Sequence, residues 1–249
     1  MKSLRNIFAG MPRLLIVFAT LGVALFATAV QSERKDAQDG GEPEAGLLSE
    51  LKALDQKLEK IKDLKAKITQ SKHVALLKDP LTSHGSMLVM GERMRWDIVK
   101  PAASTTLTSA TEIRIHYPHQ KIVEVYTVDQ RMASVIASPL PRLAMLLKHF
   151  QMERLPLPKD VDEAKFLAVR LKPRNEELKK HLDRVDVLIQ IESAVTRRME
   201  MVDVDGDRTV IDFESIELNT NLKPGDFDIT LPPGTRIVHP LDAQGKDSK

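Results

Sequence analysis

The chain has 249 residues, with 37 basic and 35 acidic side chains and a formal net charge of +2 at neutral pH. Residues 1–29 carry three basic and no acidic side chains, so the rest of the chain is almost neutral, and it offers few aromatic rings for base stacking. This balance argues against a nucleic-acid partner. The sequence has no cysteine, which excludes disulfides and a cysteine-linked lipid anchor.

The first 29 residues predict a secretory signal peptide. Basic residues precede an apolar run, Leu14–Phe26, and small residues at Ala27–Ala29 offer a cleavage site after Ala29. The alternative is an uncleaved membrane anchor, because Leu14–Val30 reaches the lower length limit for crossing a bilayer. Residues 30–46 predict a disordered linker and residues 241–249 a polar tail. One domain is expected over residues 47–240.

A helix is predicted over Leu47–Gln70. Its apolar residues recur at steps of three and four, and charged residues fill the other faces. The stripe consists of Leu47, Leu51, Leu54, Leu58, Ile61 and Ile68. A short coiled coil is one alternative, and packing against the domain's own sheet is the other.

Short alternating segments follow and predict an antiparallel meander. In Met94–Ile98 and Glu112–Tyr117 apolar residues alternate with charged ones, which gives each strand one dry and one wet face. The expected strands are Met87–Met90, Met94–Ile98, Thr105–Ser109, Glu112–Tyr117 and Lys121–Thr127.

The middle of the chain predicts a second helix, Arg142–Phe150, with an apolar side suited to covering a sheet. Phe166–Leu171 is expected to be a strand that ends before Pro173. A short helix within Asn175–Leu182 leads into the C-terminal strands.

The C-terminal part predicts a further run of strands. The expected strands are Val185–Glu192, Arg197–Val204, Thr209–Leu218, Phe227–Leu231 and a short edge strand at Arg236–His239. Asp205-Gly206 predicts a two-residue type I′ hairpin turn. Pro232-Pro233-Gly234 is expected to stop the fourth strand, because proline cannot donate to the ladder.

Catalytic and metal-binding patterns are absent from the sequence. There is no H-E-x-x-H, no G-x-S-x-G and no phosphate-binding glycine loop. His116 and His119 lack a third ligand nearby. The acidic run around Asp203–Asp207 has Arg208 where a calcium loop needs glycine. The sequence therefore predicts neither an enzyme nor a metal site, and no cofactor.

Two blocks of sequence resemble the outer-membrane lipoprotein carriers, the LolA-like proteins. The first is Gly85–Leu88 with Arg93–Asp97, Pro101 and the turn at Tyr117-Pro118. The second runs from Asp203 to Asn219 and continues to Leu231–Thr235. Members of the family often carry Arg-Pro before the aromatic-Trp pair, and Arg93 is the residue here that could take that arginine's place.

The resemblance implies a mainly β fold with helices, an incomplete antiparallel β-barrel whose hydrophobic concave face the helices cover. It implies a periplasmic carrier that binds the acyl chains of lipoproteins and moves them towards the outer membrane. The implied partners are acylated lipoproteins, an inner-membrane lipoprotein-release transporter as donor and an outer-membrane acceptor, with the carrier itself a monomer. The alternative is a sensor or scaffold on the same half-barrel, one that binds lipid or lipoprotein without transporting it.

The candidate cavity lining combines inward-facing residues of the predicted strands and the second helix. Methionine is frequent among them, and its flexible thioether suits a site for acyl chains, although it also fills ordinary cores. The candidates are Met87, Met94, Trp96, Ile98, Ile113, Ile115, Leu147, Phe150, Met199, Met201, Ile211, Phe213, Phe227 and Ile229, with Arg93 as a polar contact of the cover.

Overall fold

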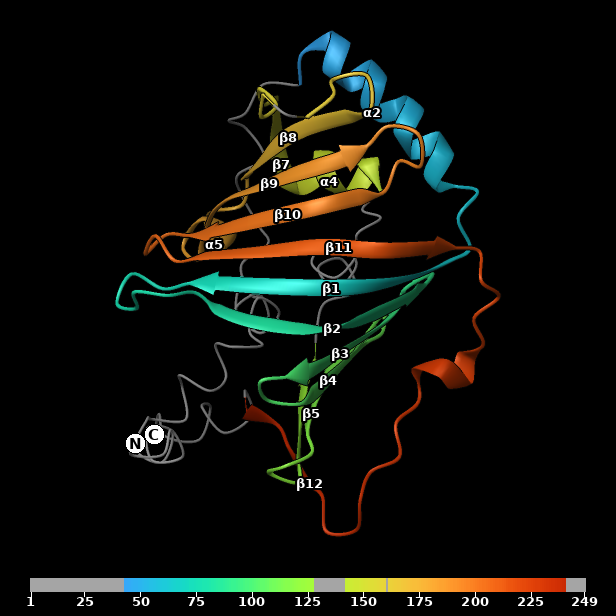
Figure 1. The fold of residues 1–249 in the computed structure, drawn as a ribbon, viewed down its shortest axis with the longest axis vertical. Coiled ribbons are helices and arrows are strands. Elements are labelled where there is room, and N and C mark those ends of the chain that lie inside the picture. Colours follow the sequence, from blue (N-terminus) through green and yellow to red (C-terminus); the bar gives the residue numbers. More distant parts are fainter. Residues whose placement is uncertain (1–42, 128–141, 160, 241–249) are drawn as a thin grey trace.

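The computed structural model describes residues 43–127, 142–159 and 161–240 (Figure 1). The expected signal peptide or anchor, its cleavage site, residues 30–42 of the linker and the tail at 241–249 lie outside the described residues. In the part of the chain that is described, no helix combines the length and the apolar character needed to cross a bilayer.

A single sheet of 12 strands forms the body of the molecule. The strands are β1 (Asp63–His73), β2 (Leu81–Met90), β3 (Arg93–Lys100), β4 (Ser104–Thr108), β5 (Glu112–Tyr117), β6 (Ile122–Thr127), β7 (Phe150–Arg154), β8 (Phe166–Pro173), β9 (Leu182–Gln190), β10 (Thr196–Asp203), β11 (Arg208–Leu218) and β12 (Arg236–Val238). The helices are α2 (Ala45–Leu58), α4 (Leu143–His149), α5 (Glu176–Lys179) and a 3-10 helix, η3 (Pro224–Phe227).

The strand order is β12-β6-β5-β4-β3-β2-β1-β11-β10-β9-β8-β7. Two meanders, β1–β6 and β7–β11, are joined where β1 pairs antiparallel with β11. β12 pairs parallel to β6 at one edge. The sheet curves strongly and stays open (Figure 1), so the predicted incomplete antiparallel barrel is confirmed, with β12 as its one parallel strand.

The two faces of the sheet differ in chemistry. Residues paired across antiparallel strands point to the same side, so the register places Met94, Met87 and Ile68 on one face with Phe213 and Met199. We call this the inner face. The opposite side, the outer face, carries Arg95, Arg114, Arg170, Asp186 and Glu200.

Helices cover the inner face at the β7–β9 end. The leucine stripe of α2, from Leu47 to Leu58, is buried in one cluster with Leu146 of α4 and with Val169 and Val187 of the sheet. α2 lies across the end of β8 and β9, and α4 lies behind the sheet (Figure 1). Each buried leucine contributes about 2 kcal/mol of gross apolar burial. The packing of α2 against its own sheet, rather than a coiled coil, is confirmed.

The predicted helix over Leu47–Gln70 is wrong in its second half. α2 ends at Leu58, and residues from Asp63 onward form β1, which pairs with both β2 and β11. Leu64, Ala66 and Ile68 are buried at a spacing of two, while the lysines between them are more exposed. Sheet pairing on both sides overrides the helix-like spacing of Ile61 and Ile68.

Two further predictions about strands are corrected. Residues Phe227–Leu231 form no strand, because the chain takes one turn of η3 and then continues outside the ladder. The β10–β11 connection is not a type I′ turn, since only Gly206 has positive φ, at 85°. Its amide donates to the Asp203 carbonyl in a β-turn, and residues 204–207 separate the strands. β7, which follows α4 directly, was not predicted.

Asp63 fastens the exit of β11 to the start of β1. Its buried carboxylate accepts hydrogen bonds from the Thr220 amide (2.6 Å) and hydroxyl (2.8 Å) and from the amides of Asn221 (3.0 Å) and Leu222 (3.3 Å). Burial alone would raise the pKa of this carboxyl, but the four hydrogen bonds together hold it below its ordinary value. The anchor fixes where the segment from Thr220 to Val238 leaves the sheet; we call this segment the C-terminal strap.

The two covering helices are linked by an ion pair. Arg142 donates from Nε and Nη2 to the two carboxylate oxygens of Asp55 on α2 at 2.8 and 2.9 Å, and Nη2 also reaches Glu59 at 3.1 Å. The Leu143 amide, at the start of α4, donates to Asp55 at 2.9 Å. The hydrogen bond from Arg142 is the main reason why the pKa of Asp55 is lowered.

Replacing Arg142 with glutamine is expected to loosen α4 from α2. A two-pronged but partly exposed pair contributes about 1 kcal/mol, so we expect that loss in unfolding free energy and faster amide exchange in α4. The loss of unfolding free energy should be complete above pH 4. It should become smaller as the pH falls through the lowered pKa of Asp55, because protonated Asp55 no longer forms the ion pair. Arg154→Gln, which breaks a single contact to Glu50 of α2, is the control; equal effects of both variants would contradict this role.

Candidate functional site

Most of the predicted lining residues lie on the inner face. Met87, Met94, Ile98, Ile211 and Phe213 belong to one buried cluster, with Trp96 packed against it. Phe150 belongs to the second cluster, under the helices, and Leu147 packs against it. Met199 and Met201 are half-buried and contact both clusters. These two methionines on β10 therefore join the helix-covered part of the inner face to the rest.

Ile113 and Ile115 extend the inner face along β5. They pair with Thr108 and Thr106 of β4, and both are fully buried. β6 continues the face with Glu124, which accepts hydrogen bonds from the Tyr126 hydroxyl at 2.9 Å and the Tyr117 hydroxyl at 3.4 Å. This half of the face is thus apolar with a few hydrogen-bonding groups.

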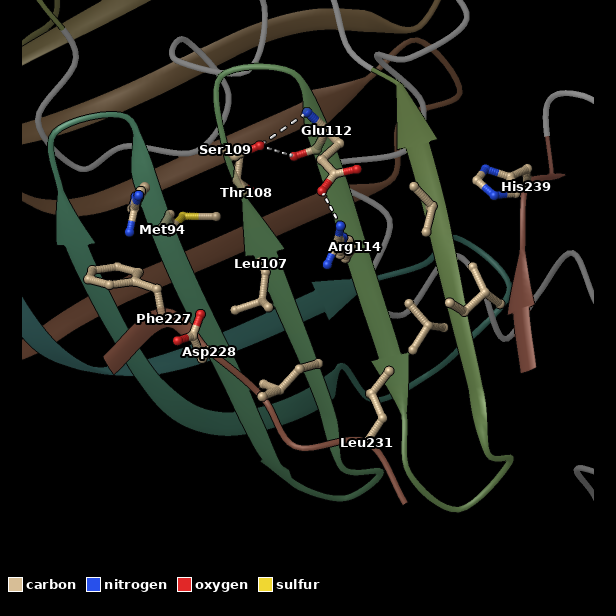
Figure 2. A pocket seen from close by; sticks show the side chains of 15 residues that line it. Met94, Leu107, Thr108, Ser109, Glu112, Arg114, Phe227, Asp228, Leu231 and His239 are labelled. Carbon is tan, nitrogen blue, oxygen red and sulfur yellow. Dashed lines mark hydrogen bonds and ion pairs between the residues drawn. The ribbon is translucent and has the colours of Figure 1, made fainter. Parts of the chain in front are cut away.

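Phe227, Ile229 and Arg93 lie elsewhere. Phe227 and Ile229 belong to the C-terminal strap, which crosses the outer face and encloses a pocket of about 670 Å³ against β3–β6 (Figure 2). Arg93, the first residue of β3, also lines this pocket. The pocket lining includes Leu107, Glu112, Arg114, Val123, Val125, Leu231, Ile237 and His239, together with Met94 and Thr108 at the ends of their strands.

Arg95 holds the strap in place, a role that the sequence did not reveal. Its Nη1 donates to the carbonyls of Asp226 (3.1 Å) and Asp228 (2.9 Å), and its Nε pairs with Asp97 at 2.8 Å. Asp97 in turn accepts a hydrogen bond from the Thr105 hydroxyl at 2.7 Å. Both edges of β3 are already paired, with β2 and β4, so residues 227–231 add no strand beside it.

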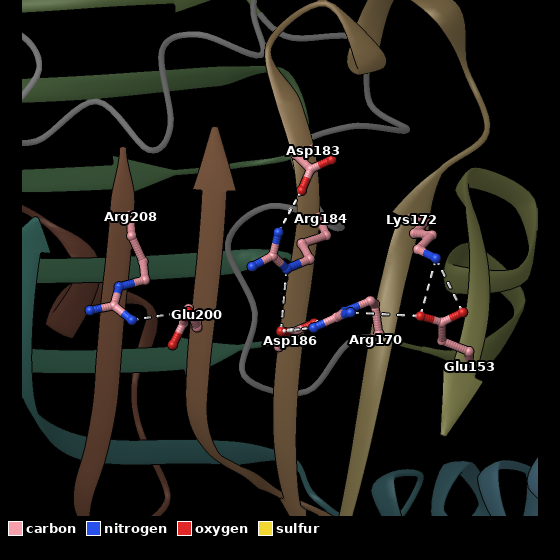
Figure 3. A network of polar contacts seen from close by, with 8 residues as sticks. All are labelled: Glu153, Arg170, Lys172, Asp183, Arg184, Asp186, Glu200 and Arg208. Atoms are coloured by element: carbon pink, nitrogen blue, oxygen red, sulfur yellow. Dashed lines mark hydrogen bonds and ion pairs between the residues drawn. The ribbon is translucent and has the colours of Figure 1, made fainter. Parts of the chain in front are cut away.

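The outer face of β7–β11 is a lattice of ion pairs (Figure 3). Arg170 pairs with Asp186 at 2.7 Å, which is the main reason why the pKa of Arg170 is raised. Arg184 and Lys172 extend the lattice to Asp186 and Glu153. Such partly exposed pairs add little stability individually, but they make this face polar and hydrated. An apolar ligand on this half of the sheet must therefore use the inner face.

The described residues contain no group of three or more His, Asp or Glu side chains placed to hold a metal ion. His116 is buried on the outer side of β5, and burial lowers its pKa. Asp203 is the last residue of β10, and burial is the main reason why its pKa is raised. Neither residue belongs to a group of potential metal ligands among the described residues.

The fold defines an open half-barrel protein whose apolar inner face is covered in part by helices. Residues 59–230 match the family described as "Outer membrane lipoprotein carrier protein LolA". The chain belongs to this family, which is one of non-enzymatic lipoprotein carriers.

Named relatives agree with this membership. The outer-membrane lipoprotein carrier protein of Dechloromonas aromatica is 29% identical over 197 residues, covering 77% of this chain and 90% of the relative. That of Bordetella avium is 27% identical over 146 residues, covering 59% and 66%. An uncharacterized conserved protein from Thermus thermophilus shares the fold, with a TM-score of 0.50 at 9% identity, over 78% of this chain and 99% of that one.

Proposed function

We propose that the protein binds the acyl chains of lipoproteins on its inner face and carries them through the periplasm towards the outer membrane, without catalysing a reaction. In this scheme an inner-membrane release transporter hands over the lipoprotein and an outer-membrane acceptor receives it. Exposed methylenes cost about 0.8 kcal/mol each in water, so a lipoprotein anchor needs such a shield in transit.

The observation that carries this proposal is the pair Met199 and Met201. They contact both buried clusters and so join them into one apolar surface. Both methionines are themselves only half-buried, so their packing is incomplete. Flexible thioethers at such a junction can rearrange around an acyl chain at little cost. The Asp55–Arg142 link sets how easily the two helices that cover this region can move.

The proposal is tested by transfer. The protein purified from the envelope is incubated with inner-membrane vesicles bearing a lipoprotein and the release transporter, and then with outer-membrane vesicles. We expect a stoichiometric soluble complex in the first step and delivery of the lipoprotein in the second. A complex that forms but never delivers would identify a sensor or scaffold instead, and the failure of any complex to form would reject both functions.

A further inference from the structure

A row of polar side chains interrupts the apolar inner face on β3 and β4. Ser104 and Thr108 are only 4% and 5% exposed, and their register partners are Ile98 and Met94. The indole Nε1 of Trp96, on the same face, is buried as well. Neither hydroxyl nor the indole N–H has a hydrogen-bond partner in the structure, as far as the chain is described.

These unpaired groups are costly in the empty protein. A buried hydroxyl or N–H without a partner loses about 1–3 kcal/mol relative to one that is hydrogen-bonded, and valine or alanine in place of these residues would avoid that loss. Two such hydroxyls on one short strand, with an indole N–H beside them, therefore indicate that a ligand supplies the missing hydrogen-bond partners.

The chemistry of the groups limits the ligand. An indole N–H can only donate, and hydroxyls can donate, so the shared requirement is a hydrogen-bond acceptor. The inward positions of β4, β5 and β6 contain one charged side chain, Glu124, which is negative. A phosphate would meet repulsion there and no cation, whereas an uncharged carbonyl would not.

Spacing supports several acceptors rather than one. Ser104 and Thr108 are four residues apart on one strand, which separates them by about 13 Å, and Trp96 lies opposite Thr106 between them. Isoleucine and methionine side chains fill the positions around them. The row therefore fits a ligand that carries several carbonyl groups at the point where its apolar chains are joined.

We propose that Ser104, Thr108 and Trp96 form a subsite for the ester and amide carbonyls that join acyl chains to a lipoprotein's modified N-terminus. This inference rests on the proposed function and deepens it: the inner face binds the polar junction of the lipid as well as its hydrocarbon. Hydrogen bonds at β4 would fix the position of the ligand along the sheet, so that its acyl chains lie over the neighbouring strands.

The test compares two ligands and three variants. The ligands are a diester lipopeptide and its diether analogue, which has the same chains without the ester carbonyls. Ser104→Ala and Thr108→Val should each weaken diester binding about fivefold, the equivalent of one hydrogen bond, and at least one of the two, the variant whose hydroxyl binds an ester carbonyl, should leave diether binding unchanged. Both should also raise the melting temperature of the empty protein by about 2–4 °C, because an unpaired buried group is removed.

Thr105→Val is the matched control on the same strand. Its hydroxyl faces outward and donates to Asp97, so this variant should lower stability and bind both ligands normally. If Thr108→Val and Ser104→Ala bind the diester as the unmodified protein does, or destabilise the empty protein, the subsite is rejected while lipid carriage stands. If the unmodified protein binds neither ligand, both proposals fall.

Discussion

Replacing Met201 with aspartate is expected to abolish lipid uptake while the protein keeps a cooperative melting transition. Met201 is half-buried on the inner face and contacts both apolar clusters. In the empty protein the new carboxylate can retain water or raise its pKa, so the stability loss should stay near 1–3 kcal/mol. An acyl chain laid over it would strip that water, so the affinity for a fluorescent fatty acid should fall at least about 100-fold.

The structure separates Met201 from other inner-face positions. Met94, Ile115 and Phe213 are almost fully buried, so aspartate there would place an unpaired charge in the core and is expected to unfold the protein. Val99→Asp, at an exposed position of β3, is the control for the added charge and should change neither property. Normal uptake by the Met201→Asp protein would show that the acyl chains do not lie across β10.

Asp63→Asn is expected to lower the free energy of unfolding by about 3 kcal/mol, although it changes little more than one atom of the side chain. In the unmodified protein the amides of Thr220 and Asn221 donate to the two carboxylate oxygens. Asparagine keeps one acceptor oxygen but places an NH2 group against one of these amides, so that two donors face each other. Chemical denaturation measures the loss. Asp226→Asn, which alters an exposed carboxylate bonded to the Lys223 amide, should lose less than about 1 kcal/mol.

The pH dependence of the Asp63 effect has a definite sign. The folded-state pKa of Asp63 is lowered, so its contribution is complete above the ordinary carboxyl pKa and is lost as the pH falls through the folded value. The difference between the unmodified and Asp63→Asn proteins should therefore be constant from pH 5 to 8 and shrink below pH 4. A difference that grew in acid would mean that Asp63 is not held as a carboxylate.

Sequence pattern predicted the strands wherever one face is dry and the other wet. β3, β5, β9, β10 and β11 alternate clearly, and their positions are confirmed within a few residues. β1 was missed because its apolar residues also fit helical spacing; only the pairing with β2 and β11 decides between them. Residues 227–231 of the strap were mistaken for a strand, because alternation records burial and not where the carbonyls bond. Here the Asp226 and Asp228 carbonyls bond to Arg95.

For the candidate site, the sequence indicated which residues share one face of the sheet. Alternation identified the inner-face residues of β2–β5, β10 and β11. It could not show that Phe227, Ile229 and Arg93 belong to a pocket on the outer face, because that depends on the path of the strap. Thr108 was overlooked because threonine is common in strands, and Ser104 because the strand was expected to begin at Thr105. The signal was their inward phase, since they pair with Met94 and Ile98.

The strand order also determines which edges the open sheet presents to other chains. Unpaired strand edges are templates for strand addition, and short edge strands limit this risk. β12 has three residues and β7 has five, so both edges are short. If the chain ended before Arg236, β6 would become the edge, with the sequence Ile-Val-Glu-Val-Tyr-Thr, whose high β-propensity is typical of aggregating segments. The end of the strap, β12, thus also protects the sheet against self-association.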